Sequence, residues 1–344
     1  MSLPALPRRA AYITLNTPQR RNALSLAELR SLRDQLIKAN TSPTTGRLLL
    51  LPPFKPSILS KLEQSLTKST TTTTPKKQNP EKEEEDYTWL TSARAFNHAR
   101  GTLPSTLILA SHGPVFSSGH DLRELRTLPP RSISETFALC AEVMSLVRRS
   151  PALIVGRVQG AAIAAGCQLA LTADLPIAHA GVRFRLPGAG LGLPCSSPVT
   201  AVGRRLGVGR GLWMLAMAEE VGAREVGDVV RVVEEEDAGQ EGRVRALDRE
   251  VARTVERLVG MSPQQSAMGK WAFWTQAGLN GGDFVGPDGD VVEGSGGDGY
   301  MDAVQWAGRV MALHAKSEDA KEGMDAFLEK RQAVWCGFEK SEKE

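Results

Sequence analysis

The residues best placed to do chemistry lie in segment 158–174, VQGAAIAAGCQLALTAD, where an apolar strand expected at 153–158 runs through a Gly/Ala turn into a helix. Small residues let a ligand approach the backbone closely, and the first N–H groups of a helix have no partner within the helix. Such an end can bind a negatively charged oxygen. The polar residue after the turn is Gln168, whose carboxamide cannot ionise. The segment therefore predicts stabilisation of an oxyanion without an acid or base beside it.

A second glycine-rich loop, residues 111–122 (SHGPVFSSGHDL), follows an apolar strand expected at 106–110. If this strand and strand 153–158 are neighbours in one sheet, their loops leave the same edge, where ligands of α/β proteins bind. One backbone N–H from each loop can then converge on a carbonyl oxygen and stabilise an enolate or a tetrahedral oxyanion. One such donor is typically worth about 2.7–4 kcal/mol. Two unrelated tight turns are the alternative interpretation.

Other catalytic motifs are absent from the sequence or have the wrong spacing. The chain has no GxxxxGK[ST], HExxH or GxSxG pattern. Residues 188–192 read GAGLG, which differs from the GxGxxG spacing of dinucleotide-binding loops. Ser118, His120 and Asp121 are too close in sequence to predict a catalytic triad, which forms across space. Three basic residues are expected on a solvated helix face: Arg204, Arg205 and Arg210.

Composition predicts a globular protein, since 41% of the 344 residues are hydrophobic and 24% are charged. The net charge of +3 is too small to imply a nucleic-acid or membrane partner. No apolar run reaches the roughly 18–20 residues of a membrane-spanning helix. The four cysteines are widely spaced and form no CxxC pair, so we expect a reducing compartment, no disulfide framework and no metal site.

The N-terminus leaves the cellular location open. Four arginines precede Glu28, the first acidic residue, and an arginine-rich, acid-poor start is typical of a mitochondrial transit peptide. A strand expected at 11–15 leaves about ten residues for such a leader. We therefore expect a mitochondrial protein, with a cytoplasmic protein that has an ordinary short terminus as the alternative.

Alternating strands and helices predict an α/β fold. Strands are expected at 11–15, 106–110, 153–158 and 175–178. Helices are expected at 25–40, 133–149, 198–206, 210–218, 243–260, 261–275, 300–316 and 318–334. The first helix has a capping box formed by Ser25 and Glu28, and Leu29, Leu32 and Leu36 give it one apolar face.

Residues 41–104 interrupt this pattern with five consecutive threonines and an acidic run. The segment has too few clustered apolar residues to offset chain entropy, so we expect a low-complexity, largely disordered insertion with ordered islands at 48–51 and 87–98. The expected organisation is a core at 1–275 that contains this insertion. A glycine-rich loop and a C-terminal helical module follow at 276–344.

Five segments, in this order, resemble the enoyl-CoA hydratase/isomerase (crotonase) superfamily: 16–24 (NTPQRRNAL), 116–122 (FSSGHDL), 158–174, 184–192 (FRLPGAGLG) and 322–331 (EGMDAFLEKR). The resemblance implies a spiral of ββα units whose C-terminal helices assemble a homotrimer or a dimer of trimers. It implies that the oxyanion hole consists of the N–H groups of His120 and Ala165. It also implies that an acyl-CoA thioester is the substrate or ligand, without a separate cofactor. The acyl-CoA contacts implied by the resemblance are Arg21, Ala23, Leu24, Ser118, Asp121 and Leu122.

The sequence departs from the family pattern at the two residues that perform hydration. Family hydratases carry one glutamate just after the Gly-rich turn and another after the segment at 184–187, where this chain has Gln168 and Gly188. A hydratase needs a base to activate water and an acid to protonate the α-carbon, and each group typically contributes about 10²–10⁴-fold. Hydration by two glutamates is therefore disfavoured, although restoring both glutamates is expected to give some activity. A mitochondrial branch of the superfamily that also lacks them implies a role in fatty-acid metabolism.

Three functional hypotheses follow from these residues. The first is an acyl-CoA-binding, enoyl-CoA hydratase/isomerase-like protein that stabilises an enolate without the glutamate pair. The second is a non-catalytic acyl-CoA-binding or regulatory protein, and the third is an inactive structural subunit. Substitute catalytic groups are His120, which titrates near neutrality, and the thiols of Cys167 and Cys195, although small buried thiols are common in packing.

Overall fold

The computed structural model describes residues 3–53, 58, 61–64, 86–91, 93–197, 199–234, 239–277, 284–285, 291–292, 304, 308, 311–312 and 315–334. Its strands are β1 (Ala10–Leu15), β2 (Thr106–Ser111), β3 (Leu153–Val158), β4 (Ala162–Ile163), β5 (Leu175–His179), β6 (Arg183–Arg185), β7 (Glu220–Gly222), β8 (Arg231–Val233), β9 (Phe284–Val285) and β10 (Val291–Val292). Its α-helices are α1 (Leu26–Asn40), α3 (Ala93–Arg100), α4 (Leu122–Leu125), α5 (Pro130–Arg149), α6 (Ala165–Thr172), α7 (Thr200–Leu206), α8 (Val208–Met217), α9 (Gln240–Val259), α10 (Pro263–Ala277) and α12 (Glu318–Glu329). Short 3₁₀ turns are η1 (Pro18–Arg20), η2 (Thr88–Leu90), η3 (Pro187–Leu191) and η4 (Ala223–Val226).

The main sheet has five parallel strands in the order β1-β2-β3-β5-β8. Strands β2 and β3 are therefore neighbours, and their carboxyl ends meet at one edge of the sheet. A shared oxyanion site between the loops that follow them requires this arrangement. A smaller sheet, β4-β6-β7, lies at that edge, and a bridge between Ser117 and Ala162 joins it to the loop after β2. The topology thus brings the two predicted loops together.

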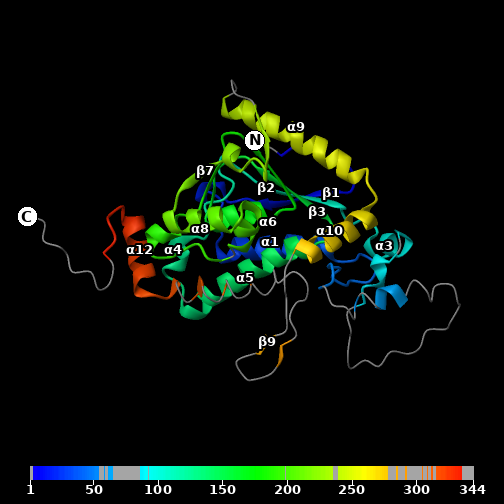
Figure 1. The fold of residues 1–344 in the computed structure, drawn as a ribbon, viewed down its shortest axis with the longest axis horizontal. Coiled ribbons are helices and arrows are strands. Elements are labelled where there is room, and N and C mark those ends of the chain that lie inside the picture. The colour runs from blue at the N-terminus through cyan, green and yellow to red at the C-terminus, as the bar shows by residue number, and fades with distance from the viewer. Residues whose placement is uncertain are drawn as a thin grey trace, which may run out of the picture.

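Helices cover both faces of the main sheet (Figure 1). In β2, Leu107 and Leu109 pack into the core shared with α1, α5 and α6, whereas Ile108 and Ala110 pack against α9. Side chains alternate between the faces of a strand, so a strand buried on both sides is apolar at every position. This burial explains why the sequence predicted these strands as short apolar runs.

Helix α1 begins at the cap that the sequence predicts, but the capping box is only half formed. The Ser25 hydroxyl accepts a hydrogen bond from the Glu28 N–H at 3.2 Å. The Glu28 carboxylate accepts one from the N–H of Asn16 at 3.2 Å, which ties the helix to the end of β1. The predicted apolar face is confirmed, because Leu29, Leu32 and Leu36 are all buried.

The described residues of the two expected islands within 41–104 form a small core of their own. Leu49 and Leu51 pack with Trp89 and Phe96, and this cluster extends to Trp271 of α10. The Thr-rich and acidic part at 65–85, where disorder is expected, lies outside the described residues. Side chains of the insertion therefore pack against α10.

The C-terminal region is described only in part. Most of the expected loop at 278–299 and helix at 300–316 lies outside the described residues. Helix α12 packs closely on η3: a Cβ at Gly323 would lie 1.9 Å from the Leu191 carbonyl oxygen. The last described helix is thus in direct contact with the loop that follows β6.

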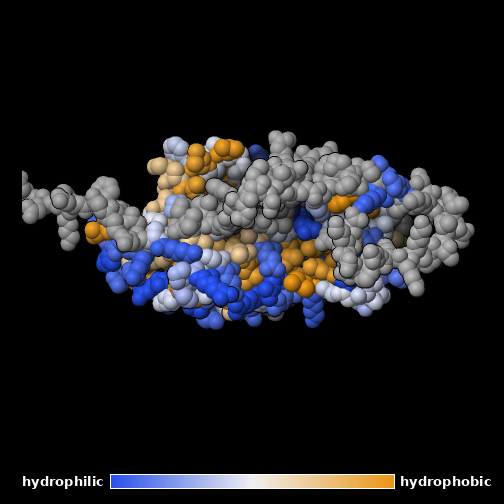
Figure 2. All heavy atoms as spheres, turned by 90° about the horizontal axis from the view of Figure 1, so that it is seen from below, coloured by the Kyte–Doolittle hydropathy of each residue, from blue (hydrophilic) through white to orange (hydrophobic). Residues whose placement is uncertain are grey.

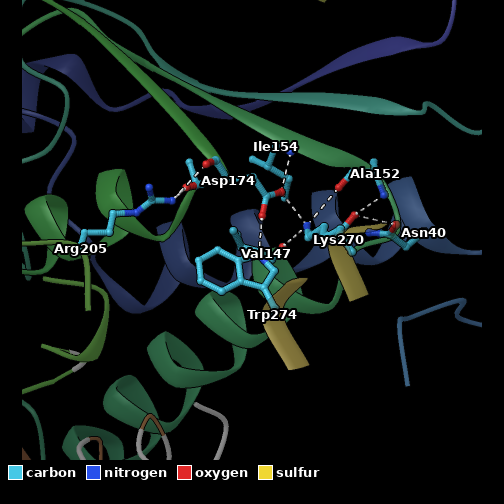
Figure 3. A network of polar contacts seen from close by, with 10 residues as sticks. Asn40, Val147, Ala152, Ile154, Asp174, Arg205, Lys270 and Trp274 are labelled. Atoms are coloured by element: carbon cyan, nitrogen blue, oxygen red, sulfur yellow. Dashed lines mark hydrogen bonds and ion pairs between the residues drawn. The ribbon is translucent and has the colours of Figure 1, made fainter. Parts of the chain in front are cut away.

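A buried polar network fixes α10 to the core (Figure 3). The Lys270 ammonium lies 2.7 Å from an Asp174 carboxylate oxygen and donates to the carbonyls of Val147 and Ala152 at 3.1 Å. Asp174 also accepts from the Trp274 indole at 3.2 Å. These bonds compensate the cost of burying both charges.

Arg205 does not lie on a solvated face, so this sequence prediction is wrong. Its guanidinium donates to the carbonyls of Leu171, Ala173 and Asp174 at the end of α6. Figure 3 shows Arg205 pointing toward Asp174. The last carbonyls of a helix have no partner within the helix, and a cation satisfies them well.

No described helix is long and apolar enough to cross a membrane.

Candidate functional site

The two predicted loops are in backbone contact. Gly119 has a φ of +84°, and a Cβ there would lie 2.7 Å from Ala164 Cβ and 3.2 Å from the nitrogen of Ala165. A Cβ at Gly166 would lie 2.5 Å from the Ser117 carbonyl oxygen. Only glycine permits such close approach, so these glycines place the loop after β2 directly beside the start of α6.

The turn after β1 is hydrogen-bonded to the loop after β2. The Ser118 N–H donates to the Arg21 carbonyl at 3.1 Å, and the Leu24 N–H donates to the Gly119 carbonyl at 2.8 Å. Ala23 and Leu24 are buried, whereas Arg21 is exposed. The structure therefore brings together the residues that the family resemblance implies for acyl-CoA contacts.

Asn22 holds this arrangement and received no role in the sequence analysis. Its amide donates to the carbonyls of His112 and Val115, both at 2.8 Å, and its side-chain oxygen accepts from the Thr17 N–H at 3.0 Å. Asn22 is fully buried with a φ of 50°, a conformation that asparagine tolerates better than most residues. Its position within the NTPQRRNAL segment is the only sequence signal, and that signal does not distinguish a binding role from this structural one.

Two N–H groups at the junction are without acceptors. Within the described residues, neither the N–H of His120 nor that of Ala165 donates a hydrogen bond. Ala165 is the first residue of α6, and the residue before it, Ala164, has φ 51° and ψ −124°. A backbone N–H without an acceptor at a helix N-terminus is suited to bind a carbonyl oxygen that gains negative charge.

Gln168 lies one helical turn after Ala165 and is fully buried. Its amide nitrogen donates to the Cys195 carbonyl at 2.7 Å. Its side-chain oxygen is buried and has no hydrogen-bond partner among the described residues. The position thus holds a neutral hydrogen-bonding group in a fixed orientation.

Gly188 is enclosed by its own loop. A Cβ at this position would lie 2.0 Å from the Leu193 carbonyl oxygen and 2.7 Å from the Cys195 sulfur. The loop is held by hydrogen bonds from the Leu193 N–H to the Gly188 carbonyl (2.9 Å) and from the Gly188 N–H to Cys195 Sγ (3.3 Å). The expectation that a glutamate can be restored here has to be revised, because the structure leaves no space for any side chain.

His120 is half-buried, and its imidazole, whose Nε2 is shielded from solvent, is neutral at neutral pH. Burial lowers the pKa of His120 to about 4, opposed in part by the Leu24 carbonyl 3.4 Å from Nδ1. The ring packs edge-on against Phe137 with centroids 4.7 Å apart, and Nε2 has no partner among the described residues. An imidazole with this pKa is a weak base, which argues against His120 as the substitute for a glutamate.

The two nearby thiols are poor nucleophiles. Burial raises the pKa of Cys167 well above its usual range and raises the pKa of Cys195 to about 11. The reactive thiolate is therefore scarce at neutral pH. These cysteines act in packing and, at Cys195, in holding the loop around Gly188.

Asp121 has a structural role in addition to its implied contact with acyl-CoA. Its carboxylate caps α4 by accepting from the N–H groups of Arg123 (3.1 Å) and Glu124 (3.3 Å), and it pairs with Arg20 at 2.8 Å. Leu122, the first residue of α4, is half-buried.

Within the described ranges, no three His, Cys, Asp or Glu side chains cluster in the way that metal ligands do.

Comparison with known proteins identifies the family. The enoyl-CoA hydratase/isomerase family model matches residues 88–277. The chain is 30% identical to rat enoyl-CoA hydratase domain-containing protein 3, mitochondrial, over 327 residues, which cover 94% of this chain and 80% of that protein. The chain belongs to the enoyl-CoA hydratase/isomerase family. The human protein of the same name is 31% identical over 233 residues, covering 67% of this chain and 68% of the human protein.

Solved structures of the family share the fold. The crystal structure of human enoyl-CoA hydratase domain-containing protein 3 has a TM-score of 0.56 at 24% identity, covering 96% of this chain and 98% of that one. An enoyl-CoA hydratase from Mycobacterium smegmatis has a TM-score of 0.56 at 28% identity, with 96% and 97% coverage. The chain therefore has the α/β crotonase fold, with a parallel sheet and covering helices, as the resemblance implied.

Proposed function

We propose that this protein binds an acyl-CoA thioester with the carbonyl oxygen between the N–H groups of His120 and Ala165. The observation that supports the proposal is the contact between Gly119 and the start of α6, where the loop that carries the His120 N–H meets the residue that carries the Ala165 N–H. Neither N–H has an acceptor among the described residues. Both donors gain hydrogen bonds when an enolate oxygen forms there. Membership of the enoyl-CoA hydratase/isomerase family supports a CoA thioester as the ligand.

The proposed chemistry is enolate stabilisation in fatty-acid metabolism, without hydration by two carboxylates. Gln168 and Gly188 supply neither an acid nor a base, and the low pKa of His120 makes it a weak substitute. This class of reaction needs a thioester carbonyl and an acidic α-carbon, which acyl-CoA provides. Binding without turnover in the same preparation would favour the non-catalytic alternative.

The test is calorimetric titration with butyryl-CoA and crotonyl-CoA, together with the carbonyl stretching frequency of bound crotonyl-CoA. We expect binding and a shift of the carbonyl stretch to lower frequency, because two donors polarise the bond. Ala165→Pro replaces one N–H by the ring Cδ, which takes the point where the carbonyl oxygen would lie, and should weaken binding by at least about 10-fold. Ala165→Ser keeps the N–H and serves as the matched control. Binding with an unshifted carbonyl, or no binding, would overturn the proposal.

The proposal includes a homotrimer or a dimer of trimers, as the family resemblance implies. Four large apolar residues of α8 are more than half exposed: Val208, Leu212, Trp213 and Met217. Figure 2 shows hydrophobic side chains gathered on one projection of the surface. Contact with a second copy would remove this surface from water. Light scattering should give a molecular mass that is a multiple of the chain mass, and Trp213→Ser should lower this measured mass. A monomeric wild-type protein would contradict the proposed oligomer.

We also propose a mitochondrial location. Its support is the name of the rat and human relatives, both of which are called mitochondrial. Fractionation of cells that express the full chain with a C-terminal tag tests the location, and a purely cytosolic signal would contradict it.

A further inference from the structure

We infer that a small cavity at the C-terminal end of α6 binds a single halide ion such as chloride. The cavity is lined by Arg148, Arg204 and Arg205, together with Trp274 and the last residues of α6. It lies at the end of α6 opposite to Ala165, roughly 10 Å along the helix, since an α-helix rises about 1.5 Å per residue. The ion site is therefore separate from the proposed thioester site and goes beyond the proposed function.

The size of the cavity admits one small occupant. Its volume is about 20 Å³, and a water molecule needs roughly 10–15 Å³ by the same measure. A monatomic ion of nearly the size of water fits this space, whereas a phosphate or carboxylate group exceeds it. Leu171 and Ala201 form apolar parts of the wall. The Thr172 hydroxyl, in the same wall, donates to the main-chain carbonyl of Gln168 at 2.7 Å.

The charge around the cavity is positive. Arg148 belongs to α5, and Arg204 and Arg205 are consecutive residues of α7. No carboxylate lines the cavity within the part of the chain that the structure describes. Guanidinium groups around one small space repel each other, and an anion between them is attracted to all of them. The cavity therefore favours a negative ion over a water molecule.

The carboxylate of Asp174 is engaged with other groups nearby. It lies 2.7 Å from the Lys270 ammonium and accepts from the Trp274 indole at 3.2 Å (Figure 3). It also accepts from the Ile154 N–H at 2.8 Å. Burial lowers the pKa of Lys270, Asp174 opposes this effect, and the Arg148 guanidinium adds to the lowering. The positive field of Arg148 thus extends to this ion pair.

The guanidinium groups are held in position before an ion binds. Arg148 is 6% exposed and stacks on Trp274, with its Cζ 3.3 Å from the ring centroid. Arg205 donates to the last carbonyls of α6, which would otherwise repel an anion. Groups that are ordered before binding lose little conformational entropy on binding. Arg204 is exposed, so the ion can enter from solvent on its side.

Bromide is the probe that locates the site, because it replaces chloride and scatters anomalously. Crystals of the full chain grown in sodium bromide should show an anomalous peak between Arg148 and Arg205. In solution, the chloride NMR signal should broaden saturably on addition of the protein, and bromide should reverse the broadening. A water molecule in place of bromide would overturn the inference. Reversal by inorganic phosphate at equal ionic strength, but not by bromide, would also overturn it.

Arg204→Gln removes one of the three charges at an exposed position, so the variant is expected to fold. The affinity for chloride should fall about 3–10-fold, as measured by the NMR titration. Arg257→Gln is the matched control, because it removes the same charge from an exposed position on α9, which packs on the other face of the sheet. The control should bind chloride as the wild-type protein does. An unchanged affinity in Arg204→Gln, or an equal loss in both variants, would contradict the inference.

Titration with butyryl-CoA separates this inference from the proposed function. Saturating butyryl-CoA should leave the affinity for chloride unchanged, because the two sites lie at opposite ends of α6. Competition between the two ligands would show that the cavity belongs to the thioester site and would overturn a separate ion site. Chloride binding by a protein that binds no thioester would support the inference and overturn the proposed function alone.

Discussion

Gly188→Ala is expected to destabilise the protein, because the structure has no space for a methyl group at this position. The added carbon would lie 2.0 Å from the Leu193 carbonyl oxygen, 2.7 Å from Cys195 Sγ and 2.8 Å from the Cys195 nitrogen. Two of these three neighbours are backbone atoms, which cannot move aside by a rotamer change. The loop has to open to accept the methyl group.

The magnitude follows from the contacts that opening disrupts. Overpacking a well-packed site typically costs about 1–3 kcal/mol. The two hydrogen bonds that close the loop, Leu193 N–H to Gly188 O and Gly188 N–H to Cys195 Sγ, contribute roughly 0.5–1.5 kcal/mol each. The expected loss is therefore about 2–6 kcal/mol. For a chain of 344 residues this corresponds to a fall in Tm of roughly 3–8 °C.

The assay is thermal or urea unfolding of Gly188→Ala beside Gly190→Ala. Gly190 lies in the same 3₁₀ turn and is exposed, and a Cβ there meets no atom within 4 Å. Its substitution should change stability by less than about 1 kcal/mol. If the two variants unfold together, the closed loop and the reasoning from it are wrong.

The same contacts predict that the double variant Gln168→Glu with Gly188→Glu gains no hydratase activity. A glutamate at 188 meets the Leu193 carbonyl, and a carboxylate at 168 faces the Cys195 carbonyl in place of the amide that now donates to it. Hydration of crotonyl-CoA is followed by the loss of its enoyl absorbance. Hydration by a variant with wild-type stability would show that the loop opens readily.

Three further predictions concern strain, buried charge and pH. Ala164→Gly should stabilise the protein by about 1 kcal/mol, as measured by urea unfolding. Ala164 has φ 51° and ψ −124°, and relief of this backbone strain exceeds the entropic cost of glycine. Unchanged or lower stability of the variant would contradict this prediction. Lys270→Met leaves the Asp174 carboxylate buried without its cation and should cost about 3–5 kcal/mol, whereas a loss below 1 kcal/mol would show that the pair contributes little. The pKa of His120 falls from 6.5 in the unfolded chain to about 4 in the folded protein. The unfolded state therefore binds more protons between these two pH values. The free energy of unfolding is lost as the pH falls from 6.5 to 4, by up to about 3 kcal/mol. His120→Asn should reduce the dependence of unfolding free energy on pH between 4 and 6.5. Part of the dependence should remain, because burial also lowers the pKa of His179.

The sequence predicted the elements that carry a strong local pattern. Strands β1, β2, β3 and β5 are apolar runs because helices cover both faces of the sheet. Strands β4, β6, β7 and β8 were not predicted, since segments of two or three residues are too short to show a period. Arg205 was assigned to solvent because its charge is visible in the sequence, whereas the helix carbonyls that it caps belong to another segment.

The sequence by itself determined the family, the parallel α/β core and the two small-residue loops from which the oxyanion hole is inferred. These features depend on residue types that act locally: apolar runs, glycines and a helix start. The tertiary structure alone decided that β2 and β3 are neighbours, that Gln168 is oriented by Cys195, that Gly188 is enclosed and that the imidazole of His120 is neutral. Each of these findings depends on atoms from a distant segment of the chain or on burial. Contacts with distant segments and the extent of burial cannot be predicted from a residue's neighbours in the sequence.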